Sequence, residues 1–127
     1  MENKRQYQRK ECSLKVRFEY FEGDPSEIDI DTSKPFKAKG IILNISRSGI
    51  FLVTNSRVSV NIPVRVNFPT RKVKKPVTGT IVRTGLLKNN PTELAKVYAH
   101  RRVKGDIYLA IHFDELLDDE IVDTISK

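Results

Sequence analysis

Hydrophobic and polar residues alternate in several short stretches of this chain. Between Ser13 and Tyr20, every second side chain is apolar, so these side chains share one face of an extended strand. The alternation returns over residues 60–68, where Pro63 indicates that a strand begins there or lies at a sheet edge. Both stretches predict half-buried β-strands.

Four further stretches are rich in the apolar and β-branched residues that favour strands, at residues 36–45, 49–54, 77–84 and 108–113. The segment 46–49 contains turn-forming residues and predicts a tight turn between two of these strands. After Phe113 the apolar residues recur at helical spacing up to Ile125. We therefore predict a mainly β fold, a six-stranded antiparallel β-barrel followed by a C-terminal α-helix.

The length of 127 residues suits a single hydrophobic core. We expect one domain over residues 1–127, with an N-terminal segment at 1–11, the barrel at 12–113 and the helix at 114–126. Two connections, at 22–35 and 86–106, are longer than a minimal barrel requires.

Charge and cysteine content narrow the class of protein. The formal net charge of +7 favours an anionic partner such as a nucleotide, a nucleic acid or an acidic protein surface. Cys12 is the single cysteine, which excludes an intrachain disulfide and a cysteine-based zinc cluster. The chain contains no apolar run long enough for a membrane span. We expect a cytoplasmic protein without membrane insertion.

Two short motifs carry candidate chemistry. Arg5 and Arg9 precede the first predicted strand, and Asn44-x-Ser46-x-x-Gly49 covers the predicted turn. Arginine offers a planar fork of donors that fits phosphate oxygens and the O6/N7 edge of guanine, while asparagine and serine supply compact donors and acceptors. Each motif alone also fits a solvated basic terminus or an ordinary hairpin turn.

Together with Gly79–Arg83 and Tyr108–Phe113, these motifs resemble the PilZ domain family over about residues 5–113. The resemblance implies a bacterial receptor for the second messenger cyclic di-GMP, with the nucleotide bound outside a six-stranded barrel. It implies that Arg5 and Arg9 lie on a flexible segment that wraps the ligand, and that Asn44 and Ser46 face a guanine while Gly49 permits the turn. Arg47, inside the turn, is a candidate additional phosphate contact. Asparagine stands where the family more often has aspartate.

The expected function is a binding module and not an enzyme. No spacing of His, Cys or carboxylate residues indicates a metal site, and no nucleophile and base are arranged for catalysis. We expect no cofactor and no catalytic residue. The proposed ligand is cyclic di-GMP, and ordering of the arginine segment on that ligand would signal to an unidentified partner protein.

Two alternatives stay open. The basic bias of residues 62–105 suits a small barrel that binds nucleic acid, although this stretch is poor in aromatic residues available for stacking on bases. The chain could also be a PilZ-like adaptor that binds protein without a ligand.

Overall fold

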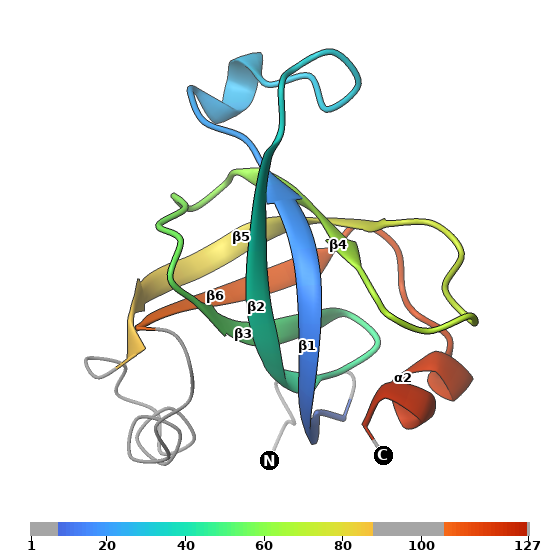
Figure 1. Cartoon of the computed structure of the whole chain (residues 1–127). Helices are drawn as coiled ribbons and strands as arrows, with labels where there is room; N and C mark the ends of the chain where they lie inside the picture. The colour runs from blue at the N-terminus through green and yellow to red at the C-terminus, as the bar shows by residue number, and fades with distance from the viewer. Residues whose placement is uncertain (1–7, 88–105, 127) are drawn as a thin grey trace, which may run out of the picture.

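The computed structural model describes residues 8–87 and 106–126 (Figure 1). Within these residues, six strands, a short 3-10 helix and one α-helix follow one another. Their bounds are β1 Lys10–Tyr20, η1 Pro25–Glu27, β2 Phe36–Ile45, β3 Gly49–Thr54, β4 Pro63–Asn67, β5 Val77–Leu86, β6 Ile107–Phe113 and α2 Asp119–Ile125.

The strands close into a barrel in the order β1-β2-β3-β6-β5-β4, and every neighbouring pair is antiparallel. Inward side chains from all six strands form one core, and α2 adds Val122 and Ile125 to it. The mainly β fold, the six-stranded antiparallel barrel and the C-terminal helix predicted from the sequence are confirmed.

Several element boundaries differ from the sequence prediction, most clearly those of β1 and α2. β1 begins at Lys10 instead of Ser13, because Lys10 already pairs with Ile45 of β2. The helix covers Asp119–Ile125 only, shorter than the predicted 114–126. Asp118, just before it, has an extended backbone, and the Leu117 amide donates to the Arg47 carbonyl at 2.8 Å instead of forming a helical turn.

The connection between β1 and β2 is ordered by local hydrogen bonds. The Asp24 carboxylate accepts from the backbone amide of Ser26 at 3.0 Å and from its hydroxyl at 2.8 Å, which begins η1. Ile28 and Ile30 then pack against the core. The connection extends from the end of the barrel opposite α2 (Figure 1). Most of the second long connection, residues 88–105, lies outside the described residues.

Two of the three irregularities in strand pairing shape the side of the barrel formed by β2, β3, β6 and β5. The β2–β3 register shifts between Ile42 and Asn44, and the β5–β6 register shifts between Ile81 and Arg83. A β-bulge of this kind bends its strand and changes where the next side chains point. Asn44 and Arg83, which follow the shifts, both line the pocket described next.

Candidate functional site

A small pocket of about 100 Å³ lies over the outer side of β3, β6 and β5. Four of the residues predicted from the two motifs line it together, namely Arg9, Asn44, Ser46 and Gly49. Arg9 reaches the pocket because β1 pairs with β2 up to Lys10, next to the end of β2 that carries Asn44. Residues 35 positions apart in the sequence thus share one surface.

Asn44 is the most unusual polar residue of the pocket. It is only 3% exposed, and its Nδ2 has no hydrogen-bond partner among the described residues. A buried amide without a partner costs free energy, of the order of 1–3 kcal/mol. An acceptor supplied by a ligand in the pocket would remove this cost.

The turn between β2 and β3 is fixed by its own polar groups. The Ser46 amide donates to the Gly49 carbonyl at 2.9 Å, and the Ser46 hydroxyl accepts from the Ser48 amide at 3.2 Å. The Ser46 and Ser48 hydroxyls lie 3.1 Å apart, at hydrogen-bond distance. Ser46 is 5% exposed, so its hydroxyl is held in place at the edge of the pocket.

Gly49 is required by the close approach of β3 to β6. It pairs with His112, and a Cβ atom at position 49 would collide with the backbone carbonyl oxygen of Ile111. The glycine predicted for the turn therefore also sets the distance between the strands that form the pocket floor.

Arg47 is not among the residues that line the pocket. Its Nε donates to the Leu117 carbonyl at 2.7 Å and lies 3.6 Å from the Asp119 carboxylate. The turn is thereby connected to the segment that leads into α2. A phosphate contact by Arg47, as the sequence suggested, would compete with these contacts.

Arg5, the other half of the arginine pair, lies outside the described residues. Lys10, next to Arg9, forms an ion pair with Asp123 of α2. The beginning of β1, the β2–β3 turn and α2 lie at the same end of the barrel (Figure 1).

Sequence reasoning did not identify the other seven lining residues, among them Val82, Arg83 and His112. Val82 is 51% exposed, and Arg83 and His112 are also exposed. The bulge in β5 brings Val82 and Arg83 to the surface at consecutive positions, and the β3–β6 register places His112 opposite Gly49. Neither a bulge nor a register can be read from alternation along a single strand.

The pocket lining combines cationic, polar and apolar groups. Arg9 and Arg83 supply guanidinium groups, Asn44 and Ser46 supply amide and hydroxyl groups, and Val82 offers an exposed apolar surface. This set suits a ligand that carries both an anion and a flat ring. The described residues contain no cluster of three or more His, Cys, Asp or Glu side chains that could hold a metal ion.

No helix among the described residues is long and apolar enough to cross a membrane.

Comparison with solved structures finds similar proteins, among them the following two. The PilZ domain of YcgR from Escherichia coli, solved with c-di-GMP, superposes with a TM-score of 0.54 at 9% identity, over 97% of this chain and 86% of that one. The Bacillus subtilis inhibitor of motility MotI/DgrA superposes with a TM-score of 0.51 at 15% identity. That match covers 98% of this chain but only 49% of the B. subtilis protein. At such identities the likeness concerns the fold. Comparison with curated proteins finds no match.

The family model of the PilZ domain matches residues 3–123. The match includes both motifs, all six strands and most of α2. The chain belongs to the PilZ domain family.

Proposed function

We propose that this protein is a cyclic di-GMP receptor that binds the nucleotide over the pocket lined by Arg9, Asn44 and Ser46. The observation that carries the proposal is the buried Nδ2 of Asn44, which lines this pocket and has no partner among the described residues. Family membership supports the proposal, as does the c-di-GMP in the similar E. coli structure.

The chemistry of the ligand matches the lining. Cyclic di-GMP carries two phosphate charges, which guanidinium groups bind through charge-assisted hydrogen bonds. The O6 and N7 atoms of guanine are acceptors and would pair with the unsatisfied Asn44 donor. Val82 would lie against part of the ring system, where contact with a base removes apolar surface from water.

The size of the pocket bears on how the ligand is held. Its volume of about 100 Å³ is well below the roughly 300–1,000 Å³ of pockets that enclose a drug-sized ligand. A dinucleotide would therefore insert one edge and lie largely on the barrel surface. We propose that the segment carrying Arg5 closes over it and that the ordered segment forms a surface read by a partner protein.

Calorimetric titration with cyclic di-GMP tests the site. We expect micromolar or tighter binding, weakened by about tenfold or more in Arg9→Ala, since a lost charge-assisted hydrogen bond is worth about 1.5–3 kcal/mol. Ser46→Ala is expected to weaken binding as well. Arg71→Ala, an exposed arginine that is not among the pocket-lining residues, is the matched control and should change the affinity less than about twofold.

The role of the arginine segment needs a separate readout. Hydrogen exchange of residues 1–9, measured with and without cyclic di-GMP, should slow on binding if the segment orders on the ligand. Arg5→Ala should weaken binding and reduce this protection. Tight binding with unchanged hydrogen exchange would support the receptor function but contradict ordering of the arginine segment on the ligand.

If the parent protein did not bind cyclic di-GMP, one of the two alternative functions would be favoured. Salt-dependent binding to single-stranded oligonucleotides would then favour the nucleic-acid-binding barrel. Binding to neither ligand would favour an adaptor that acts through protein contacts alone.

A further inference from the structure

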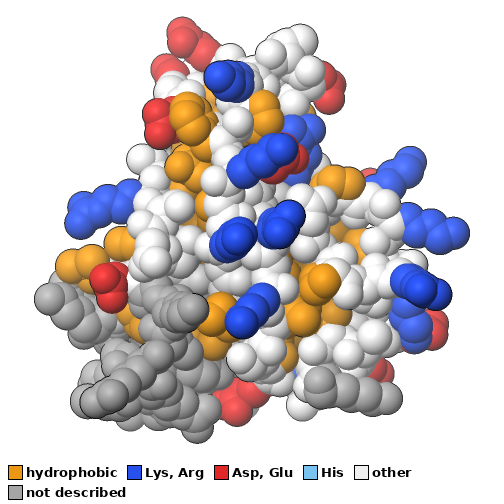
Figure 2. Space-filling model, viewed as in Figure 1, with side chains coloured by type: hydrophobic (Ala, Val, Ile, Leu, Met, Phe, Trp, Pro, Cys, Tyr) orange, Lys and Arg blue, Asp and Glu red, His pale blue; other side chains and the backbone are white. Residues whose placement is uncertain are grey.

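A second outer surface of the barrel carries unpaired positive charge. Lys15 and Arg17 of β1 lie on the same side of the strand, and so do Lys37 and Lys39 of β2. All four are exposed, and none forms an ion pair within the described part of the chain. Figure 2 shows Lys and Arg side chains gathered over these two strands. We call this surface the basic face.

Strand pairing brings like charges together on the basic face. Arg17 pairs directly with Lys39, an arrangement that destabilises a sheet. Glu19, opposite Lys37, could neutralise part of the charge, but its carboxylate already lies 3.2 Å from Arg65 Nε. An anionic partner would remove this repulsion.

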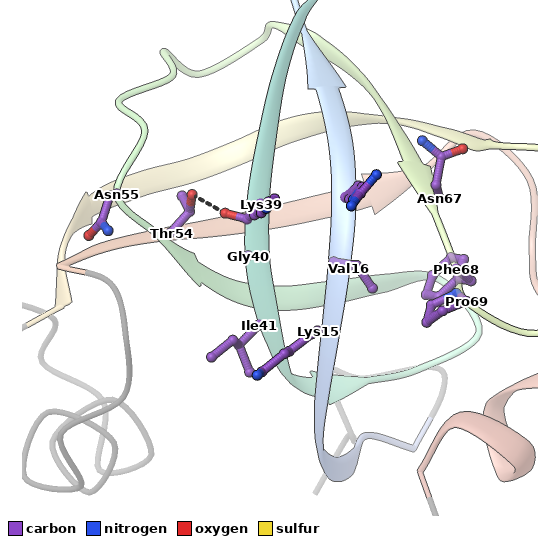
Figure 3. A pocket seen from close by; sticks show the side chains of 11 residues that line it. Lys15, Val16, Lys39, Gly40, Ile41, Thr54, Asn55, Asn67, Phe68 and Pro69 are labelled. Carbon is purple, nitrogen blue, oxygen red and sulfur yellow. Dashed lines mark hydrogen bonds between the residues drawn. The ribbon is translucent and has the colours of Figure 1, made fainter.

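Two hollows give the basic face a shape as well as a charge. They measure about 630 and 610 Å³ and share Arg17, Lys39 and Asn67, so they lie side by side, and we refer to them together as the groove. Apolar groups of Val16, Ile41, Phe68 and Pro69 line its larger part, between Asn55 on one side and Asn67 on the other (Figure 3). None of the described residues that line the small pocket on β3, β6 and β5 lines this groove.

The form of the groove favours a protein segment over other anions. Nucleic-acid surfaces usually offer aromatic rings for base stacking, but the one aromatic residue in the larger hollow, Phe68, is only 6% exposed. A flat anionic membrane would leave the hollows unfilled. An acidic segment with apolar side chains would satisfy the cations and fill the groove.

We propose that the basic face is a docking surface for an acidic, partly apolar segment of a partner protein. Its carboxylates pair with Lys15, Arg17, Lys37 and Lys39, and its apolar side chains enter the groove beside Ile41 and Pro69. The net charge of +7 speeds the encounter with such a partner. The proposal does not depend on nucleotide binding, because the two surfaces share no described lining residue.

Two labelled synthetic peptides of 14 residues test the proposal by fluorescence anisotropy at 100 mM salt. In one peptide, pairs of glutamates alternate with pairs of leucines. In the other, serine replaces each leucine, so the two peptides carry the same charge. The glutamate–leucine peptide should bind at least tenfold more tightly, because only its side chains fill the apolar groove. Equal affinities would overturn the role of the groove.

Charge reversal locates the binding surface. Lys37→Glu with Lys39→Glu should weaken binding of the glutamate–leucine peptide at least tenfold. Lys74→Glu with Lys75→Glu, at exposed lysines outside the groove, gives the same net charge and should change it less than twofold. Similar losses of peptide affinity in both variants would mean that the net charge of the protein attracts the peptide, and would overturn the proposal.

A second, milder variant tests the same surface in case the charge-reversal variant does not fold. Lys15→Gln with Lys39→Gln removes charge without placing an acid near Glu19, and it should weaken peptide binding at least threefold. Cyclic di-GMP titration of each variant reports separately on the first pocket and should be unchanged. Tighter binding of a twelve-nucleotide single strand or of phosphatidylserine vesicles, lost in the same variants, would assign the basic face to those anions instead.

Discussion

The two outer surfaces of this barrel differ in almost every property that is used to recognise a site. The pocket on β3, β6 and β5 is small, about 100 Å³, and contains buried polar side chains. The basic face on β1 and β2 has a groove of more than 600 Å³ and exposed cations. By volume alone the basic face would be chosen as the ligand site.

The two surfaces differ in the free energy that a partner gains by pairing with their polar groups. Asn44 is nearly fully buried and its Nδ2 has no partner among the described residues, so a ligand that accepts from it gains free energy that water cannot supply. The lysines of the basic face are hydrated, and pairing them in water is worth little each. The first surface therefore suits specific recognition of a small molecule, and the second suits a large partner that makes many weak contacts.

The largest effect should come from adding one methyl group to the pocket side of the barrel. Gly49→Ala drives a Cβ atom into the backbone oxygen of Ile111, which β6 cannot move without losing its pairing with β3. We expect a loss of about 3 kcal/mol in the free energy of unfolding, measured by urea denaturation.

Gly40→Ala is the matched substitution beneath the basic face. Its Cβ would lie 2.9 Å from the Val53 carbonyl oxygen and 3.0 Å from a methyl carbon of Leu52, which is crowded but less severe. The loss should be about half as large. A larger loss for Gly40→Ala than for Gly49→Ala would contradict the view that the pocket side has the tighter strand approach.

Arg47→Ala should have the next largest effect, because it removes support behind the pocket. The guanidinium donates to the Leu117 carbonyl, and its loss leaves that oxygen without this donor. We expect the free energy of unfolding to fall by about 1–2 kcal/mol, with cyclic di-GMP affinity changing much less than in Arg9→Ala.

Lys72→Ala is the control for Arg47→Ala, since it breaks only an exposed ion pair with Glu120 of α2. It should destabilise the fold less. If Arg47→Ala left stability unchanged and abolished nucleotide binding, Arg47 would be a ligand contact, as the sequence first suggested.

Arg47 also illustrates what the sequence could and could not predict. The barrel and the helix could be predicted from patterns among residues that are neighbours in the chain. These patterns are the alternation at β1 and β4, the turn residues after β2 and the helical spacing after Phe113. The partner of Arg47 is 70 residues away, so only the closed fold reveals it. The same holds for His112, which strand pairing places opposite Gly49.

A smaller effect, of opposite sign, is expected for Asn44→Leu. The substitution replaces a buried unsatisfied amide with an apolar side chain of similar size, which should leave the free energy of unfolding unchanged or raise it by up to about 1 kcal/mol. Calorimetry should show that cyclic di-GMP binding is lost. Lys39→Leu, on the basic face, should leave nucleotide binding intact, and equal losses in both variants would contradict the separation of the two surfaces.

The smallest effect concerns Cys12, which lies in β1 between Arg9 of the pocket and Lys15 of the basic face. Burial raises the pKa of its thiol from 9.0 to about 11, and Sγ lies 3.6 Å from the Ile42 carbonyl of β2. Between pH 9 and 11 the unfolded chain loses this proton first, so the folded state binds more protons and its stability falls as the pH rises. The wild type should therefore lose more stability than Cys12→Ser between pH 8 and 10, by up to about 1 kcal/mol per pH unit above pH 9. Urea denaturation of both proteins at the two pH values measures the difference, and parallel pH profiles would mean that the thiol ionises as readily in the barrel as in the unfolded chain.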